Sequence, residues 1–134
     1  MEFRENVRSA VKQSAEERNA QHVYVRCNYR RVTVPDADGT ERIEWQYDEY
    51  YMTDNEYENI RAGRLFGIDE WSDALRGVER SYLYDHADKY IMKARTDAPN
   101  PELEAALISY KAAIRATVNQ PTYPQTVVYP EPPI

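Results

Sequence analysis

The stretch HVYVRCNYRRVTV (22–34), with its continuation PDADGT (35–40) and RIEWQYDEYYM (42–52), decides the fold class of this chain. In the first and last of these runs, apolar and polar residues alternate, which is typical of β-strands that bury one face. The run between them contains proline, two aspartates and glycine, which favour a tight turn. The sequence therefore predicts an antiparallel β-hairpin over residues 22–52.

The alternation also predicts what each face of the hairpin carries. On one face, arginines of the first strand should lie opposite acidic residues of the second strand, which helps to fix the register of a strand pair. The other face should carry the apolar positions Val23, Val25, Cys27, Ile43, Trp45 and Tyr47.

The segment before the hairpin is polar and rich in helix-forming residues. Within residues 1–20, only a weak apolar stripe at helical spacing is present, formed by Val7, Ala10, Val11 and Ala15. We expect either a short helix or a mobile lead-in here.

Residues 53–119 are predicted to be helical. Thr53 and Glu56 have the spacing of a capping box, and Gly63 suits the end of the short helix that would follow. A long helix is expected from Asp69 to about Asp97, ended by the loop APNP (98–101).

A second long helix should follow this loop, with Asn100 as its N-cap and Pro101 in its first turn. Because the loop is short, the two long helices are expected to form an antiparallel helical hairpin. The stripe on the second helix is spaced as an apolar face that packs on a partner: Leu103, Leu107, Tyr110, Ile114 and Thr117.

The chain ends in NQPTYPQTVVYPEPPI (119–134), which contains five of the eight prolines. Proline interrupts both helices and sheet ladders, so residues 120–134 should form an extended arm. Since Val127, Val128 and Tyr129 are apolar and β-prone, the arm should lie on a surface. That surface is either the arm's own domain, where residues 126–129 could add a third strand to the hairpin, or a partner.

The predicted architecture is α+β, a β-hairpin packed on a helical hairpin with a proline-rich arm. At 134 residues, the chain has the length of one domain, residues 1–134. It carries twelve tyrosines against two phenylalanines. Tyrosine suits half-exposed surfaces and interfaces, so this excess fits either a thin core or a binding surface.

The charge and hydropathy of the chain argue against several classes of protein. A net charge of −6 argues against a nucleic-acid-binding protein and against a surface held to anionic lipid. No run approaches the roughly 18 apolar residues of a membrane span, and the charged first twenty residues do not resemble a signal peptide. We expect a protein that stays in a cytoplasm, with no nucleic-acid or membrane partner.

No combination of residues predicts catalysis, a metal site or a cofactor. Cys27 is the one cysteine, and His86 has Lys89 and Tyr90 at the helical positions where a second metal ligand would be needed. The acidic residues between 44 and 58 are expected to be a solvated face, and Asp36 and Asp38 a turn. We therefore expect no enzyme activity.

The C-terminal third carries a motif of three parts. The first is the helical run Tyr110, Lys111, Ala112, Ala113, Ile114 and Arg115. The second is the turn from Asn119 to Pro124, and the third is the close Val127, Val128, Tyr129 and Pro130. Over residues 90–133, this order resembles the C-terminal module of tailed-phage tail or tail-fibre assembly chaperones. That family has a Tyr-Arg-x-Ala-Leu-Arg helix, a Gln-Pro or Gln-x-Gly-Phe-Pro turn and a Trp-Pro close.

This chain departs from the family pattern at three positions: Lys111 replaces arginine, Tyr123 replaces phenylalanine and Tyr129 replaces tryptophan. A looser similarity links Trp45, Tyr47, Asp48, Glu49 and Tyr57 to phage or prophage proteins of Gram-positive hosts.

The resemblance implies a non-enzymatic assembly protein that binds a phage tail or tail-fibre polypeptide in the host bacterial cytoplasm. The alternative that it leaves open is a minor structural component of the tail, present in the virion, that forms homo-oligomers through its C-terminal arm. The residues expected to contact the partner are Tyr110, Arg115, Tyr123, Val127, Val128 and Tyr129.

Overall fold

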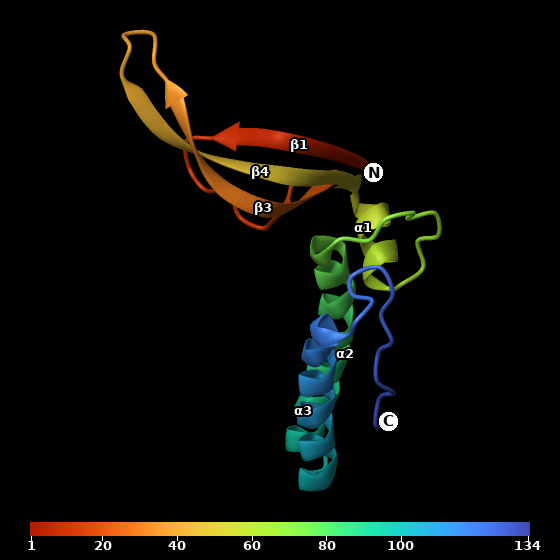
Figure 1. Cartoon of the computed structure of the whole chain (residues 1–134). Helices are drawn as coiled ribbons and strands as arrows, with labels where there is room; N and C mark the ends of the chain where they lie inside the picture. Colours follow the sequence, from red (N-terminus) through yellow and green to blue (C-terminus); the bar gives the residue numbers. More distant parts are fainter. The chain divides into compact units, whose positions relative to one another are not determined.

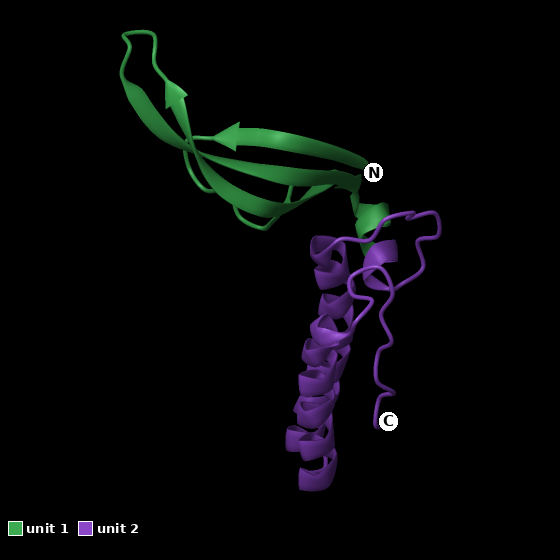
Figure 2. Ribbon diagram, viewed as in Figure 1, with its two compact units in different colours: residues 1–58 green, residues 59–134 purple.

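A computed structural model describes all residues, 1–134, and its elements confirm the α+β class (Figure 1). They are, in chain order, β1 (Glu2–Ser9), β2 (Glu16–Arg18), β3 (His22–Pro35), β4 (Glu41–Thr53), α1 (Asp54–Arg61), α2 (Asp73–Thr96), α3 (Pro101–Ala116) and a 3-10 turn (Thr117–Asn119). The chain folds as two compact units, residues 1–58 and 59–134 (Figure 2). Each unit is described by itself.

The first unit contains a four-stranded antiparallel sheet of order β1-β4-β3-β2. The predicted hairpin is confirmed as β3 and β4. Its turn forms as expected: the amide of Asp36 donates to the carbonyl of Thr40 (2.6 Å), and Gly39 adopts a φ of +87°.

The helix or lead-in predicted over residues 1–20 is wrong, because this segment supplies the two edge strands of the sheet. β1 pairs with β4, and β2 pairs with β3. Pairing with an existing hairpin overrides the helix propensity of these residues, and edge strands need no strong apolar alternation. The C-terminal residues 126–129, which could have added a strand, are not part of the sheet.

A β-bulge changes the predicted faces of the hairpin. The register shifts between Cys27 and Arg30, and Asn28 adopts a φ of +56°. One extra residue exchanges the two faces of a strand. Consequently, Tyr47 lies on the same face as Arg26 and Glu49, not with Val23 and Val25.

An arginine does face an acid across the strands, but the pair is Arg26 with Glu49 (2.9 Å), and both are buried. Since β1 and β2 occupy opposite edges, the segment between them must cross one face of the sheet. It crosses the Arg26 face, where Arg26 donates to the carbonyl of Ser14 (3.1 Å) and the Tyr29 hydroxyl donates to the carbonyl of Gln13 (3.0 Å).

The helix starts follow the local chemistry of the sequence. The capping box is confirmed, because the Thr53 hydroxyl accepts from the Glu56 amide and the Glu56 carboxylate accepts from the Thr53 amide (both 3.2 Å). α2 begins four residues later than predicted, at Asp73, because the Ser72 hydroxyl caps it by accepting from the Leu75 amide (3.2 Å).

The second unit is built on the predicted antiparallel hairpin of α2 and α3. Asn100 caps α3 through its bond from the Leu103 amide (3.1 Å), and Pro101 occupies the first turn. Ion pairs Arg95–Glu104 (2.7 Å) and Lys111–Asp88 (2.5 Å) link the two helices. Their buried residues include Leu75, Val78, Ala87, Ile91, Ala94, Leu107, Tyr110 and Ile114. None of the helices combines the length and the apolar character needed to cross a membrane.

Candidate functional site

Residues 120–134, which we call the strap, run back along the α2–α3 hairpin within the second unit (Figure 1). The ring of Tyr129 packs on a cluster formed by Ala87, Tyr110 and Ile114. The strap is therefore part of the apolar core of its own unit, which answers the question of what surface the arm lies on.

A buried arginine on α2 holds the strap backbone. Arg76, with 7% of its surface exposed, donates from Nε to the carbonyl of Pro124 and from Nη2 to the carbonyl of Gln125 (both 2.8 Å). Its third contact, from Nη1, is to the carboxylate of Glu79 (2.9 Å). The planar guanidinium thus binds two consecutive carbonyls and one carboxylate, a geometry that lysine cannot reproduce.

Glu79 is the second buried charge under the strap. It is 8% exposed and accepts a hydrogen bond from the Tyr129 hydroxyl (2.5 Å). Burial, and then this bond to the carboxylate, raise the pKa of Tyr129 well above its usual range. The folded unit therefore favours the neutral phenol of Tyr129.

A second tyrosine anchors the turn of the strap. The Tyr123 hydroxyl accepts from Arg80 Nη1 (2.7 Å) and donates to the Asp73 carboxylate. Burial and the bond to Asp73 raise the pKa of Tyr123. Arg80 and Asp73 also form an ion pair with each other on α2 (3.7 Å), so both partners of this pair help to fix the strap.

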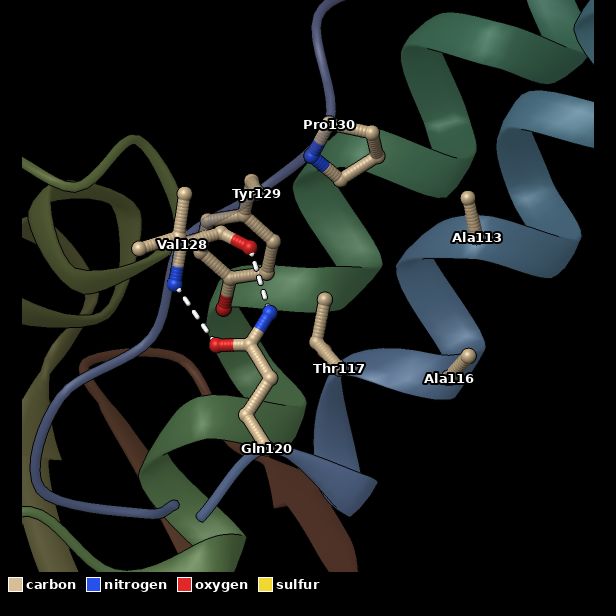
Figure 3. Close-up of a pocket in the computed structure, with 7 residues that line it drawn as sticks. All are labelled: Ala113, Ala116, Thr117, Gln120, Val128, Tyr129 and Pro130. Carbon is tan, nitrogen blue, oxygen red and sulfur yellow. Dashed lines mark hydrogen bonds between the residues drawn. The ribbon is translucent and has the colours of Figure 1, made fainter. Parts of the chain in front are cut away.

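Two glutamine side chains bind the backbone as a neighbouring strand would. Gln120 accepts from the Val128 amide (2.9 Å) and donates to the Val128 carbonyl (2.7 Å), as Figure 3 shows. Gln125 makes the same pair of bonds with Trp71, at 3.2 and 3.0 Å. The Arg76 guanidinium lies over the Trp71 ring, 3.8 Å from its centroid.

The side of the strap that faces away from the helices presents one largely exposed apolar side chain, that of Val128. The Val128 side chain is not covered, since 73% of the residue is exposed. Beside it lies an open hollow of about 340 Å³ (Figure 3). The hollow is lined by Ala113, Ala116, Thr117, Gln120, Val128, Tyr129 and Pro130.

A second hollow of about 240 Å³ lies further along the strap. Its walls come from α2, α3 and the chain end, and they are mostly aromatic or aliphatic. The lining residues are Tyr82, Leu83, His86, Ala87, Tyr90, Leu107, Tyr110, Pro132 and Ile134.

The residues predicted to contact a partner take different positions in this arrangement. The structure brings Tyr110 and Tyr129 together in the core, and Tyr123 and Val127 are half-buried. Val128 is the strap residue of this set that is fully available to another molecule. Arg115 is exposed in the last turn of α3.

Sequence reasoning missed the polar side chains that hold the strap, namely Asp73, Arg76, Glu79, Arg80, Gln120 and Gln125. Arg76 and Glu79 stand next to the apolar positions Leu75 and Val78, which is a weak signal that this side of α2 is covered. Which segment covers it is a long-range property that the local pattern does not contain.

Two residues that were considered for catalysis or metal binding, His86 and Asp48, make contacts within the fold. Nδ1 of the exposed His86 lies 3.1 Å from the carbonyl of Tyr82. The hydrogen bond from Asn28, together with the amide of Asn6 and the guanidinium of Arg30, lowers the pKa of Asp48. No group of three or more His, Cys, Asp and Glu side chains is placed to hold a metal ion.

No family model, curated protein or solved structure matches this chain. The site must therefore be interpreted from its own geometry.

Proposed function

We propose that this chain is a non-enzymatic assembly protein of a tailed phage, acting in the host cytoplasm. It binds a tail or tail-fibre polypeptide through the outer side of the strap. The proposal rests on two supports: the resemblance of residues 90–133 to tail assembly chaperones, and the presentation of an apolar side chain on a firmly held segment.

The observation that carries the proposal is the exposure of Val128 beside the hollow. Its backbone is bonded on both sides by Gln120, so the side chain is presented in one orientation (Figure 3). A segment that is ordered before binding loses little conformational entropy on association. An ordered apolar side chain next to an open apolar hollow is a suitable anchor for a partner side chain.

The prolines of the strap define how a partner could be bound. Pro124, Pro130, Pro132 and Pro133 have no amide hydrogen, and the Val128 amide is already bonded to Gln120. An extended partner segment could not form a continuous ladder with this edge. Recognition should therefore depend on side chains entering the hollow and covering Val128.

The test is a binding titration, measured by isothermal titration calorimetry, against individually purified phage tail and tail-fibre polypeptides. We expect one of them to bind. Val128→Asp should weaken that binding at least about tenfold, because a carboxylate would be buried without a partner.

A matched control is Val11→Asp, which changes an equally exposed valine in the first unit, with 69% of the residue exposed. It should leave the affinity unchanged. Absence of binding by every tail and fibre polypeptide would remove the functional proposal, whereas equal losses in the two variants would remove only the strap as the site.

The alternative is a structural tail component whose arms exchange between copies. In such an exchange, the strap of one copy would make the same bonds to Arg76 and Glu79 of another. Mass spectrometry of purified particles separates the two functions, since an assembly chaperone should be absent from the virion.

A further inference from the structure

The outer face of α3 is exposed and uncharged. It lies opposite the buried positions Leu107, Tyr110 and Ile114 and includes Ile108, of which 49% is exposed. The complete outer face consists of Ala105, Ile108, Ser109, Ala112 and Ala116, all exposed.

An uncharged outer face is unusual for a helix in contact with water, where charged and polar residues normally occupy the solvent side. The neighbouring α2 follows the normal pattern, with exposed Asp85, Asp88, Lys89 and Lys93. In addition, a two-helix hairpin has one open side on each helix, and such hairpins commonly complete their packing with further helices. We therefore expect another helix to pack on this face of α3.

The charges at the ends of α3 identify which partner fits. Glu102 in the first turn and Arg115 in the last turn are exposed. The other two charged residues of α3 are already paired within the chain, Glu104 with Arg95 and Lys111 with Asp88. Glu102 and Arg115 have no ion pair or hydrogen bond of their own.

These positions are symmetric about the middle of the helix. Glu102 and Arg115 lie equally far from the midpoint between Ile108 and Ser109, and so do Ala105 and Ala112. We propose that a second copy of this chain packs its α3 antiparallel on this face, forming a twofold-symmetric dimer.

The antiparallel arrangement places the acidic end of each α3 level with the basic end of the other, with Glu102 and Arg115 on the two flanks of the contact, because thirteen residues turn a helix by about 220°. It also sets the two helix dipoles antiparallel, with each N-terminus beside the other C-terminus. A parallel pair would bring like charges together at both ends. The alanines and Ser109 allow the two helix backbones to approach closely, and each Ile108 fills the space beside them.

A single pair of helices buries less area than the roughly 800 Å² per partner of a standard interface. The dimer should therefore dissociate on dilution. The dimer face and the wall of the hollow beside Val128 share Ala116. The dimer is therefore tested with variants at other positions of α3.

The experiment is sedimentation velocity of the purified full chain, without any other protein, from low micromolar to sub-millimolar concentration. The wild type should pass from monomer to dimer. Ile108→Asp and Ala112→Lys should both remain monomers, while Met92→Asp, which changes an apolar residue on α2 that is 61% exposed, should dimerise as the wild type does.

Charge reversal tests the antiparallel arrangement. Glu102→Arg or Arg115→Glu alone should raise the dissociation constant of the dimer about five- to tenfold, and the double variant should restore it. Circular dichroism of each variant checks that the helices remain folded.

A wild type that stays monomeric throughout would overturn the proposal. So would a dimer that Met92→Asp disrupts as much as Ile108→Asp does. A double reversal weaker than either single reversal would exclude the antiparallel pairing.

Discussion

At the scale of single residues, the second unit depends on two buried charged side chains, Arg76 and Glu79. Arg76 and Glu79 are stabilised because they bond to each other and to the strap: the arginine also binds two strap carbonyls, and the glutamate also binds the Tyr129 hydroxyl. Removing one partner of a buried charge leaves the remaining charge poorly solvated, and the loss exceeds the value of the bond itself.

Replacing Tyr129 by phenylalanine removes only the hydroxyl that reaches Glu79. Because the carboxylate stays buried, Tyr129→Phe should lower the free energy of unfolding by about 1–3 kcal/mol. Urea denaturation followed by circular dichroism measures this loss. Tyr90→Phe is the control, since Tyr90 is exposed, and its substitution should change stability by less than about 0.5 kcal/mol.

The raised pKa of Tyr129 predicts how stability changes at alkaline pH. The folded unit favours the neutral phenol, so this contribution is complete below the ordinary tyrosine pKa of about 10 and is lost as pH rises through the raised pKa. The free energy of unfolding should fall above about pH 10. In Tyr129→Phe, the fall should be shallower, though not absent, because the pKa of Tyr123 and Tyr110 is also raised. An identical slope in both proteins would contradict this account.

Arg76→Met tests the other charge. It leaves two carbonyls without a donor and Glu79 without its cation, so it should cost about 3–5 kcal/mol and increase amide exchange in the strap. Arg95→Met, which breaks an exposed ion pair, should cost less than about 1 kcal/mol. Equal effects would show that burial of Arg76 does not decide its contribution.

At the scale of elements, a single residue decides which side chains share a face of the sheet. Asn28 adopts a left-handed conformation at the bulge, which most side chains adopt only with strain. Alternation alone could not reveal this, because the pattern on each side of the bulge is regular. The hairpin and its turn are therefore evident in the sequence, but Ile43, Trp45 and Tyr47 lie on the face opposite to Val23 and Val25 and not beside them as predicted.

The bulge makes a specific prediction about substitutions. Asn28→Gly should be tolerated, whereas Asn28→Val should destabilise the first unit by about 1–3 kcal/mol, since a β-branched residue is strained at this φ. Thermal unfolding of the two variants gives the comparison. If valine were as stable as glycine, the strand would have to have lost its bulge, and the register could be checked by nuclear Overhauser contacts between β3 and β4.

Elements that depend on residues close together in the sequence could be predicted, and those that depend on distant residues could not. The capping box at Thr53 and the Asn100–Pro101 helix start depend on residues a few positions apart, and both are confirmed. β1 and β2 exist only because β3 and β4 offer edges to pair with, so nothing within residues 1–20 could indicate them. The contacts of the strap are of the same kind, since Arg76 and Gln125 are distant in the chain.

At the scale of the whole molecule, the proline-rich end is a structural part of the second unit. A chain that stops after Gln120 would expose the apolar cluster around Ala87 and Tyr110 and leave Arg76 and Glu79 without their strap partners. We expect this truncation to lose helical circular dichroism at a lower temperature than the full chain does. An unchanged melting curve would show that the helical hairpin is stable without the strap.

The arrangement of the sheet also constrains when it can form. β1 leaves the ribosome before its partner β4, so Glu2 cannot meet Tyr51 until the hairpin has been synthesised. During this interval, β1 has no hydrogen-bonding partner strand. The charged residues that make it a poor strand in isolation also favour its hydration. Charged side chains on an edge strand disfavour pairing with a wrong edge, so the composition that makes β1 a weak strand in isolation should also limit mispairing of the nascent chain.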